Sequence, residues 1–140
     1  MSVVKFEELD HTADVGLRVY GATFEDLLAN AAEGMFSLIG RACFTPAELR
    51  NRTLRLARGV REEVLFQWLR ALLREFNRDG FFPVDIEVDS IEEGLTAEVR
   101  GGIFDPARQE FFSEIKAVTY HGLWVRETAF GFEAEVIFDV

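Results

Sequence analysis

The order of the predicted elements indicates an α+β fold, in which two main helices pack on a largely antiparallel β-sheet within a single domain. Two segments place apolar residues three and four positions apart, which is the spacing of an amphipathic helix. Most of the other segments alternate apolar and polar residues, which is typical of strands with one buried face. The chain of 140 residues has the length of one domain, residues 1–140, and is long enough to bury a core.

The two helices are predicted from apolar spacing and from their end signals. The first covers residues 23–39, where Thr23 is a suitable N-cap and Asp26 follows it by three positions. The second covers residues 62–78 and ends before Gly80. Its apolar positions are Leu65, Trp68, Leu69, Leu72 and Phe76, and its Arg and Glu residues are expected on a solvated face.

Strands are predicted wherever the alternation has a period of two. These segments are residues 3–9, 15–20, 52–56, 84–89, 95–100, 115–125 and 132–139. The acidic positions of residues 84–89 and 95–100 are expected on the wet side of an antiparallel sheet. Gly101 and Gly102 are expected in a loop after the fifth of these strands.

The charge of the chain limits the classes of partner. The formal net charge is −10 and the isoelectric point is about 4.7. An acidic domain repels phosphates, so we expect no direct binding of RNA or DNA. A cation or a basic protein is the more natural partner.

Cysteine content and hydropathy favour a cytoplasmic protein. The single cysteine, Cys43, excludes an intramolecular disulfide, and we expect it to be a small apolar filler. The amino-terminal residues carry no long apolar segment like that of a signal peptide, and no stretch of about 18 apolar residues predicts a membrane span. A reducing compartment fits this composition.

The stretch from Asp10 to Gly16 is the strongest candidate for chemistry. Asp10 and Asp14 would share one face of an extended chain, and His11 would lie on the other. Asp139 and Val140, at the end of the last predicted strand, could complete a site with oxygen ligands only. Such ligands suit calcium, magnesium or manganese, whereas no zinc pattern is present. The alternative is that the aspartates cap turns and accept backbone hydrogen bonds.

Two further residues in the late stretch 116–121 are candidates for a supporting role. Lys116 is either an exposed strand lysine or a countercharge for Asp14 or Asp139. His121 is, with His11, one of two histidines, and both could belong to a polar network. No nucleophile elbow, phosphate-binding loop or zinc-protease motif occurs, so we predict no catalytic residue.

Three motifs in register resemble the archease family over the whole chain. They are Asp10-His11-Thr12-Ala13-Asp14-Val15-Gly16, Lys116-Ala117-Val118-Thr119-Tyr120-His121 and Val136-Ile137-Phe138-Asp139-Val140. The resemblance implies a small metal-binding protein that assists an RtcB-type RNA ligase in tRNA splicing and RNA repair. In that role it is not an enzyme, but promotes formation of the guanylate on a ligase histidine and allows multiple turnover.

The resemblance also implies roles for residues of this chain. The metal ligands match Asp14, Asp139 and Val140, and calcium is the ion seen in relatives. Lys116 and His121 match positions that support function, and Asp10 and His11 belong to the first motif. Gly102 departs from a frequent Glu and Phe132 from a frequent Trp. Phe132 keeps the apolar bulk, so the last strand should survive, whereas the role of the missing carboxylate is open.

Three functional hypotheses follow. In the first, Asp139 and Val140 form a short tail that reaches into the ligase cleft, while Asp14 holds the ion from the folded body. In the second, the chain is a stand-alone metal-dependent phosphoester hydrolase that uses Asp14, Asp139 and His121. In the third, it is a chaperone-like structural module whose carboxylates only cap turns.

Overall fold

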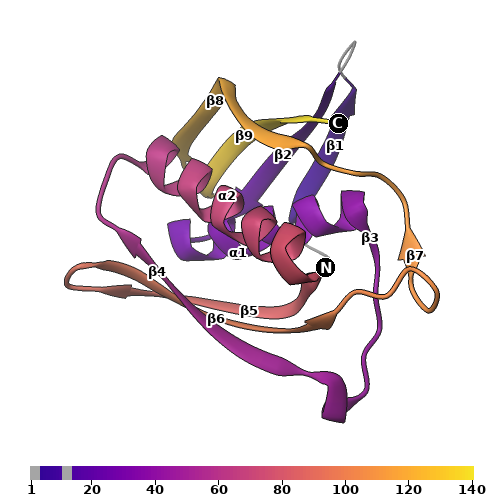
Figure 1. The fold of residues 1–140 in the computed structure, drawn as a ribbon. Coiled ribbons are helices and arrows are strands. Elements are labelled where there is room, and N and C mark those ends of the chain that lie inside the picture. The colour runs from indigo at the N-terminus through magenta and orange to yellow at the C-terminus, as the bar shows by residue number, and fades with distance from the viewer. Residues whose placement is uncertain (1–3, 11–13) are drawn as a thin grey trace.

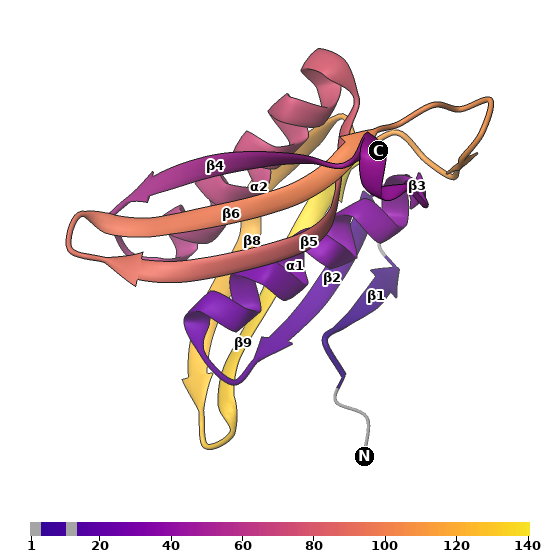
Figure 2. The same cartoon turned by 90° about the horizontal axis from the view of Figure 1, so that it is seen from below.

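The computed structural model describes residues 4–10 and 14–140 and arranges them in three layers (Figures 1 and 2). A four-stranded antiparallel sheet and a three-stranded antiparallel sheet enclose a layer of two helices. The helices are α1 (Phe24–Ile39) and α2 (Arg61–Asp79). Helix α1 packs against both sheets, and α2 does the same on its own side of the molecule. The predicted α+β class with two main helices is therefore confirmed.

The four-stranded sheet joins the two ends of the chain. Its strands are β1 (Phe6–Asp10), β2 (Asp14–Gly21), β8 (Ala117–Thr128) and β9 (Gly131–Asp139), in the order β1-β2-β9-β8. The three-stranded sheet is built from the middle of the chain. Its strands are β4 (Arg50–Ala57), β5 (Phe81–Ile91) and β6 (Gly94–Ile103), in the order β4-β6-β5.

Three short elements were not predicted. Strands β3 (Gly40–Arg41) and β7 (Glu110–Phe111) pair with each other, and a 3₁₀ turn covers Pro46–Glu48. A strand of two residues is too short to show a period in sequence, so only its long-range partner defines it.

The helix predictions are accurate to within one or two residues. The Thr23 hydroxyl caps α1 by accepting a hydrogen bond from the backbone N–H of Asp26 at 3.1 Å. Helix α2 ends at Gly80, which has a φ of 83° that suits glycine. The two helices are joined in the core, where the buried Trp68 Nε1 donates to the carbonyl of Leu28 at 2.7 Å.

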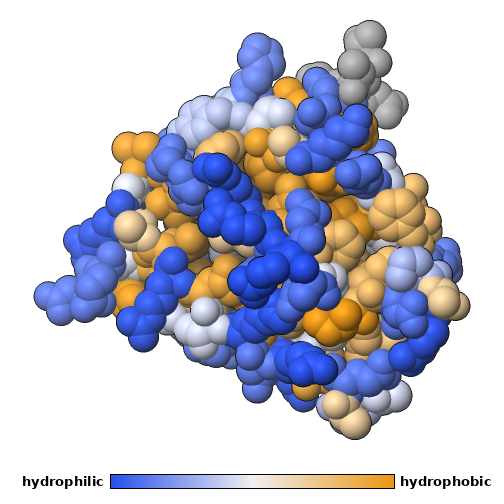
Figure 3. Space-filling view, viewed as in Figure 1, coloured by the Kyte–Doolittle hydropathy of each residue, from blue (hydrophilic) through white to orange (hydrophobic). Residues whose placement is uncertain are grey.

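The apolar side of each helix packs in the core, and the polar side is exposed to solvent. Met35 and Phe36 are buried, as are the predicted α2 positions Leu65, Trp68, Leu69 and Leu72. Arg70 and Arg74 are exposed, as expected for a solvated face. Figure 3 shows hydrophilic side chains gathered over α2 on the face drawn in Figure 1.

The prediction that Gly101 and Gly102 lie in a loop was wrong. Both are buried inside β6, opposite Pro83 and Phe82 of β5. Glycine is needed there for close approach rather than for a turn, because a Cβ on Gly102 would lie 2.6 Å from Cε1 of Phe44. The Phe44 ring therefore occupies the space in which a glutamate at position 102 would begin.

Two further expectations about the sheets are met. The acidic residues Asp85, Glu87 and Glu98 are exposed on the wet side. Phe132 lies in β9 opposite Gly21 and packs on Phe24 with ring centroids 6.1 Å apart, so the last strand forms without tryptophan.

The expectation that Cys43 fills the core was wrong. Cys43 is exposed, in the connection between β3 and the 3₁₀ turn at Pro46–Glu48. A membrane span was not expected, and none of the helices in the described part of the chain is long and apolar enough to form one.

Candidate metal-binding end of the four-stranded sheet

Strands β2 and β9 bring the two best candidate ligands directly opposite each other. Strand β2 begins at Asp14 and β9 ends at Asp139, and the antiparallel register pairs these two residues. Residues directly opposite in such a pair have Cβ atoms roughly 4.5–5.5 Å apart. The amino-terminal and carboxy-terminal motifs therefore meet at one end of this sheet, which we call the acid end.

Alternation places both carboxylates on the face of the sheet that points away from the helices. Leu17 and Val19 of β2 are buried on the helix side, as are Val136 and Phe138 of β9. Asp14 and Asp139 have the opposite parity, because successive side chains point to opposite faces. Asp139 is exposed and Asp14 is half-buried, so an ion can reach both from solvent.

The third motif supports this end through its backbone. Strand β8 begins with Ala117 opposite Asp139, and the N–H of Lys116 donates to the Asp139 carbonyl at 2.7 Å. The Asp139 main chain is thus held on both sides, by β2 and by β8. The Lys116 side chain is exposed.

The idea of a short carboxy-terminal tail was wrong. Asp139 belongs to β9, which lies between two neighbouring strands, and Val140 is half-buried against the core. The acid end is therefore a fixed edge of the folded body. Main-chain oxygens of Val140 follow Asp139 directly and lie at this same end of the sheet.

The remaining predicted residues fall into two groups. The Asp10 backbone pairs with Val15 at the acid end, but the Asp10 side chain and all of His11 lie outside the described residues. His121 is exposed in β8, between Thr119 and Trp124, which pair with Ile137 and Glu135 of β9. His121 is thus displaced along the sheet from Asp139, and the described structure does not bring the two together.

The irregular segment that holds His121 packs against α2. Three extra residues of β8 lie between Thr119 and Trp124, and Gly122 adopts a φ of 68° there. The Tyr120 ring meets Phe66 of α2 edge-on at 5.1 Å between centroids. Partial burial, together with the carboxylates of Glu63 and Glu62, raises the pKa of Tyr120 above its ordinary value.

The electrostatics of the acid end favour a cation. Two carboxylates directly opposite each other repel, and within residues 4–10 and 14–140 neither Asp14 nor Asp139 forms an ion pair. No group of three His, Cys, Asp or Glu side chains in that described part of the chain is arranged to hold a metal. Two carboxylates with adjacent main-chain oxygens match the donor chemistry of calcium, so the residues present fit such an ion.

A second polar cluster on the same face was not singled out from the sequence. Arg18 and Arg126 each place a guanidinium group over the indole of Trp124, with guanidinium carbons 5.2 and 4.5 Å from its ring centroid. Trp124 Nε1 and Arg18 both donate to Glu135, at 3.0 and 3.3 Å. Only the pairing of β2, β9 and β8 brings these residues together, so no local pattern marks them.

The fold and the acid end define a single-domain α+β protein with a carboxylate pair where its first and last motifs meet. The model of the Archease protein family (MTH1598/TM1083) matches residues 6–140. The chain belongs to the archease family, as the sequence motifs predicted.

Relatives agree with this membership over nearly their whole length. The chain is 35% identical to "Protein archease" of Methanosarcina barkeri over 144 residues, covering 97% of this chain and 96% of the relative. It is also 35% identical to that of Methanopyrus kandleri over 139 residues, covering 96% and 99%.

Two solved structures have a similar fold. The solution structure of Methanobacterium thermoautotrophicum protein 1598 superposes with a TM-score of 0.73 at 28% identity, covering 96% of this chain and 98% of the other. The crystal structure of an archease from Thermotoga maritima, described as a possible chaperone, gives a TM-score of 0.69 at 24% identity, with 96% of each chain covered.

Proposed function

We propose that this archease family protein is a metal-binding accessory protein that activates an RtcB-type RNA ligase, and that it is not itself an enzyme. In this role it promotes guanylylation of the ligase histidine and multiple turnover, in the cytoplasm, during tRNA splicing and RNA repair. The observation that supports the proposal is the register of β2 and β9, which sets Asp14 opposite Asp139.

Asp14, Asp139 and Val140 hold a divalent cation in this proposal. Calcium is the expected ion, with magnesium and manganese as alternatives, because all the donors are oxygens. Such an ion neutralises charge during phosphoryl transfer when it is bound near phosphates. The role of the protein is to hold the two carboxylates at a fixed spacing on a rigid sheet edge, and Lys116 supports that edge through its bond to the Asp139 carbonyl.

The net charge favours a protein partner over a nucleic acid. With a formal charge of −10, the domain is attracted to the basic cleft of an RNA-binding enzyme and is repelled by free RNA. The acid end is an exposed edge, so it can approach such a cleft without unfolding. RNA is then contacted by the ligase, and the accessory protein meets the nucleotide-binding side of the ligase.

Ligase guanylylation with GTP tests the proposal directly. Purified RtcB-type ligase is assayed alone, with the wild-type protein, and with Asp14→Asn or Asp139→Asn. Each substitution removes a charge and keeps the side-chain shape, so we expect activation to fall at least about tenfold without loss of the fold. The matched control is Glu98→Gln, which removes an exposed carboxylate from the other sheet and should leave activation intact.

The same assay separates the two other hypotheses. Turnover of a phosphoester by the purified protein without ligase, lost in Asp14→Asn, would establish the hydrolase and overturn the accessory role. Wild-type activation and wild-type calcium binding by both aspartate variants would mean that these carboxylates only cap turns. In that case the chaperone-like module would be the better description.

A further inference from the structure

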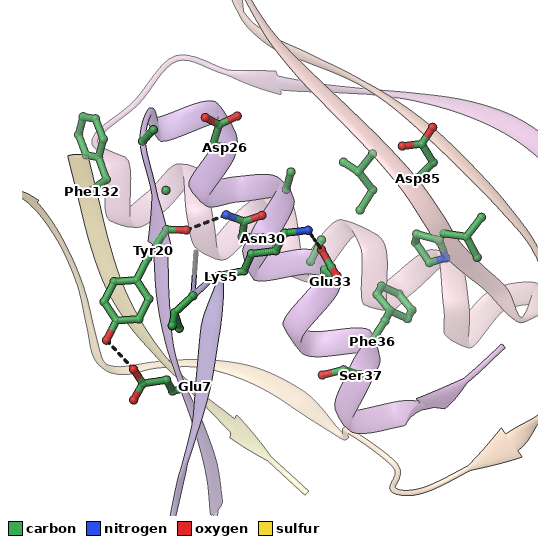
Figure 4. Close-up of a pocket in the computed structure, with 18 of the residues that line it drawn as sticks. Lys5, Glu7, Tyr20, Asp26, Asn30, Glu33, Phe36, Ser37, Asp85 and Phe132 are labelled. Carbon is green, nitrogen blue, oxygen red and sulfur yellow. Dashed lines mark hydrogen bonds and ion pairs between the residues drawn. The ribbon is translucent and has the colours of Figure 1, made fainter. Parts of the chain in front are cut away.

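A long groove runs along α1 on the side of the molecule away from α2. Its floor is the outer face of α1, and its walls come from the β1–β2 side of one sheet and from β5 of the other (Figure 4). Its volume is about 1360 Å³. Pockets for small molecules usually enclose roughly 300–1,000 Å³, so this open groove is larger than a small ligand requires.

Exposed apolar side chains line this groove. Phe130, in the turn between β8 and β9, is 95% exposed, and Val4 is 55% exposed. Val84 is 47% exposed because the register of β5 shifts between Pro83 and Asp85, which breaks the alternation of the strand. Apolar side chains gathered in a concave surface are typical of a binding site rather than of an ordinary solvent-exposed surface.

Both walls are outer strands of their sheets. Strand β1 is one end of the order β1-β2-β9-β8, and β5 is one end of the order β4-β6-β5. An outer strand leaves one row of backbone N–H and C=O groups without a ladder partner. Extended peptides bind such edges by adding a strand, with main-chain hydrogen bonds supplying affinity.

The charges in the groove are mostly negative. Figure 4 shows Glu7 on the β1 side and Asp85 on β5, with α1 between them, and Asp26 near the start of α1. The groove lysine, Lys5, is neutralised by Glu33 at 3.1 Å. Arg41 pairs with Glu110 at 3.5 Å, and Glu133 with Arg126 at 2.9 Å. The Glu7 carboxylate accepts a hydrogen bond from Tyr20 on the far face of its sheet, at 3.1 Å, and does not face α1. Asp26 and Asp85, which line the groove, have no basic partner among the described residues, so the groove is complementary to a cation.

We propose that this α1 groove binds an extended, cationic segment of a partner protein. Side chains of an extended peptide alternate between two faces, so apolar residues meet the floor while Lys or Arg residues meet the carboxylates of Asp26 and Asp85. The groove and the acid end involve different residues. A peptide can therefore bind in the groove whether or not the acid end holds a metal.

A displayed library of random ten-residue peptides, panned on the wild-type protein, tests the chemistry of the occupant. We expect enrichment of sequences in which Lys or Arg alternates with large apolar residues. Enrichment of acidic sequences, or no enrichment, would overturn the proposal. An enriched peptide is then synthesised with a fluorophore, and its affinity is measured by anisotropy.

A matched pair of variants tests the location. Asp85→Lys and Asp89→Lys change the same exposed residue type on the same strand, but only Asp85 lines the groove. Asp85→Lys should weaken the peptide about tenfold or more, whereas Asp89→Lys should change affinity much less. Equal effects of the two would overturn the proposal, because they would report only net charge.

Two further variants separate the groove from the acid end. Phe130→Ser removes an exposed apolar contact and should also weaken the peptide, while thermal unfolding checks that the fold is kept. Asp14→Asn should leave peptide affinity unchanged, so failure of the metal proposal and failure of the groove proposal give different results. Loss of peptide binding in Asp14→Asn would overturn the independence of the two sites.

Discussion

Each of the two sheets contains a pair of carboxylates directly opposite across an antiparallel ladder, but the two pairs differ in their surroundings. Asp14 faces Asp139 in the four-stranded sheet, and Glu87 faces Glu98 in the three-stranded sheet. The glutamates lie within their strands, and Thr53 donates its hydroxyl to both oxygens of Glu98 at 3.0 Å. The aspartates lie at strand ends, beside the main chain of Val140.

The difference teaches what distinguishes a candidate metal site from an ordinary wet surface. A glutamate has one more rotatable bond than an aspartate, so two opposed glutamates can move apart, and Glu98 already has a hydrogen-bond donor. The short aspartates stay near their backbone, and the acid end offers further main-chain oxygens. The glutamate pair is thus an internal control for the aspartate pair.

The largest expected difference is in calcium affinity. Asp14→Asn or Asp139→Asn should weaken calcium binding by about 100-fold or more. Loss of a residue that only hydrogen-bonds a metal ligand already lowers metal affinity roughly 10–100-fold, and these two residues are proposed as direct ligands. Glu87→Gln and Glu98→Gln should leave the affinity within about twofold. Titration calorimetry of the four variants measures this. Equal weakening in both pairs would show that calcium responds only to the overall negative charge.

Calcium should also stabilise the wild-type fold. A ligand that binds only the folded state at 100 times its Kd adds about 2.7 kcal/mol of stability. For a domain of this size that corresponds to a rise in Tm of roughly 8 °C. Differential scanning calorimetry with calcium and with a chelator should show this rise in the wild type and in Glu87→Gln. The same rise in Asp139→Asn would exclude the acid end as the site.

A smaller effect is expected from extending the chain after Val140. Three added Gly or Ser residues turn the Val140 carboxylate into a neutral peptide carbonyl, and removing one ligand charge should lower calcium affinity about tenfold. The fold should be kept, because Val140 packs through its side chain. The control is the same extension at the amino terminus. Unchanged affinity of the carboxy-terminal extension would remove Val140 from the ligand set.

The sequence predicted the local features of both sheets better than their pairing. The helix over residues 23–39 and the faces of the strands follow from local spacing and from the Thr23 cap. Periodicity places Asp14 and Asp139 at strand ends but cannot say that β2 and β9 are neighbours, because that pairing joins opposite ends of the chain. The family motifs supplied the expectation that the two residues meet, and the register of β2 and β9 shows that they lie directly opposite each other.

The wrong predictions have a common physical cause, because one residue type occurs in several structural environments. Glycine marks turns but also close contacts, so Gly102 was placed in a loop although it lies under the Phe44 ring. A lone cysteine is usually buried, yet Cys43 lies in an exposed connection. The groove along α1 could not be predicted at all, since it forms between segments from both sheets.

The smallest expected effect concerns the metal-free protein. In the earlier predictions the aspartate variants are the impaired ones, whereas here the aspartate variant should be more stable than the wild type. Without a cation, the opposed carboxylates of Asp14 and Asp139 repel, so Asp14→Asn should raise the free energy of unfolding by about 0.2–1 kcal/mol. Glu87→Gln should raise it less, because the glutamates can separate and Glu98 is hydrogen-bonded to Thr53. Urea unfolding in the presence of a chelator measures both changes.

Salt and calcium provide the checks on this last prediction. At 1 M salt the Debye length is about 3 Å, so the gain in Asp14→Asn should shrink if it comes from repulsion. With calcium at saturation the sign should reverse, because the wild type then gains binding energy that the variant lacks. A gain that persists in calcium would mean that Asp14 and Asp139 are merely an unfavourable surface pair, no different in kind from the pair in the other sheet.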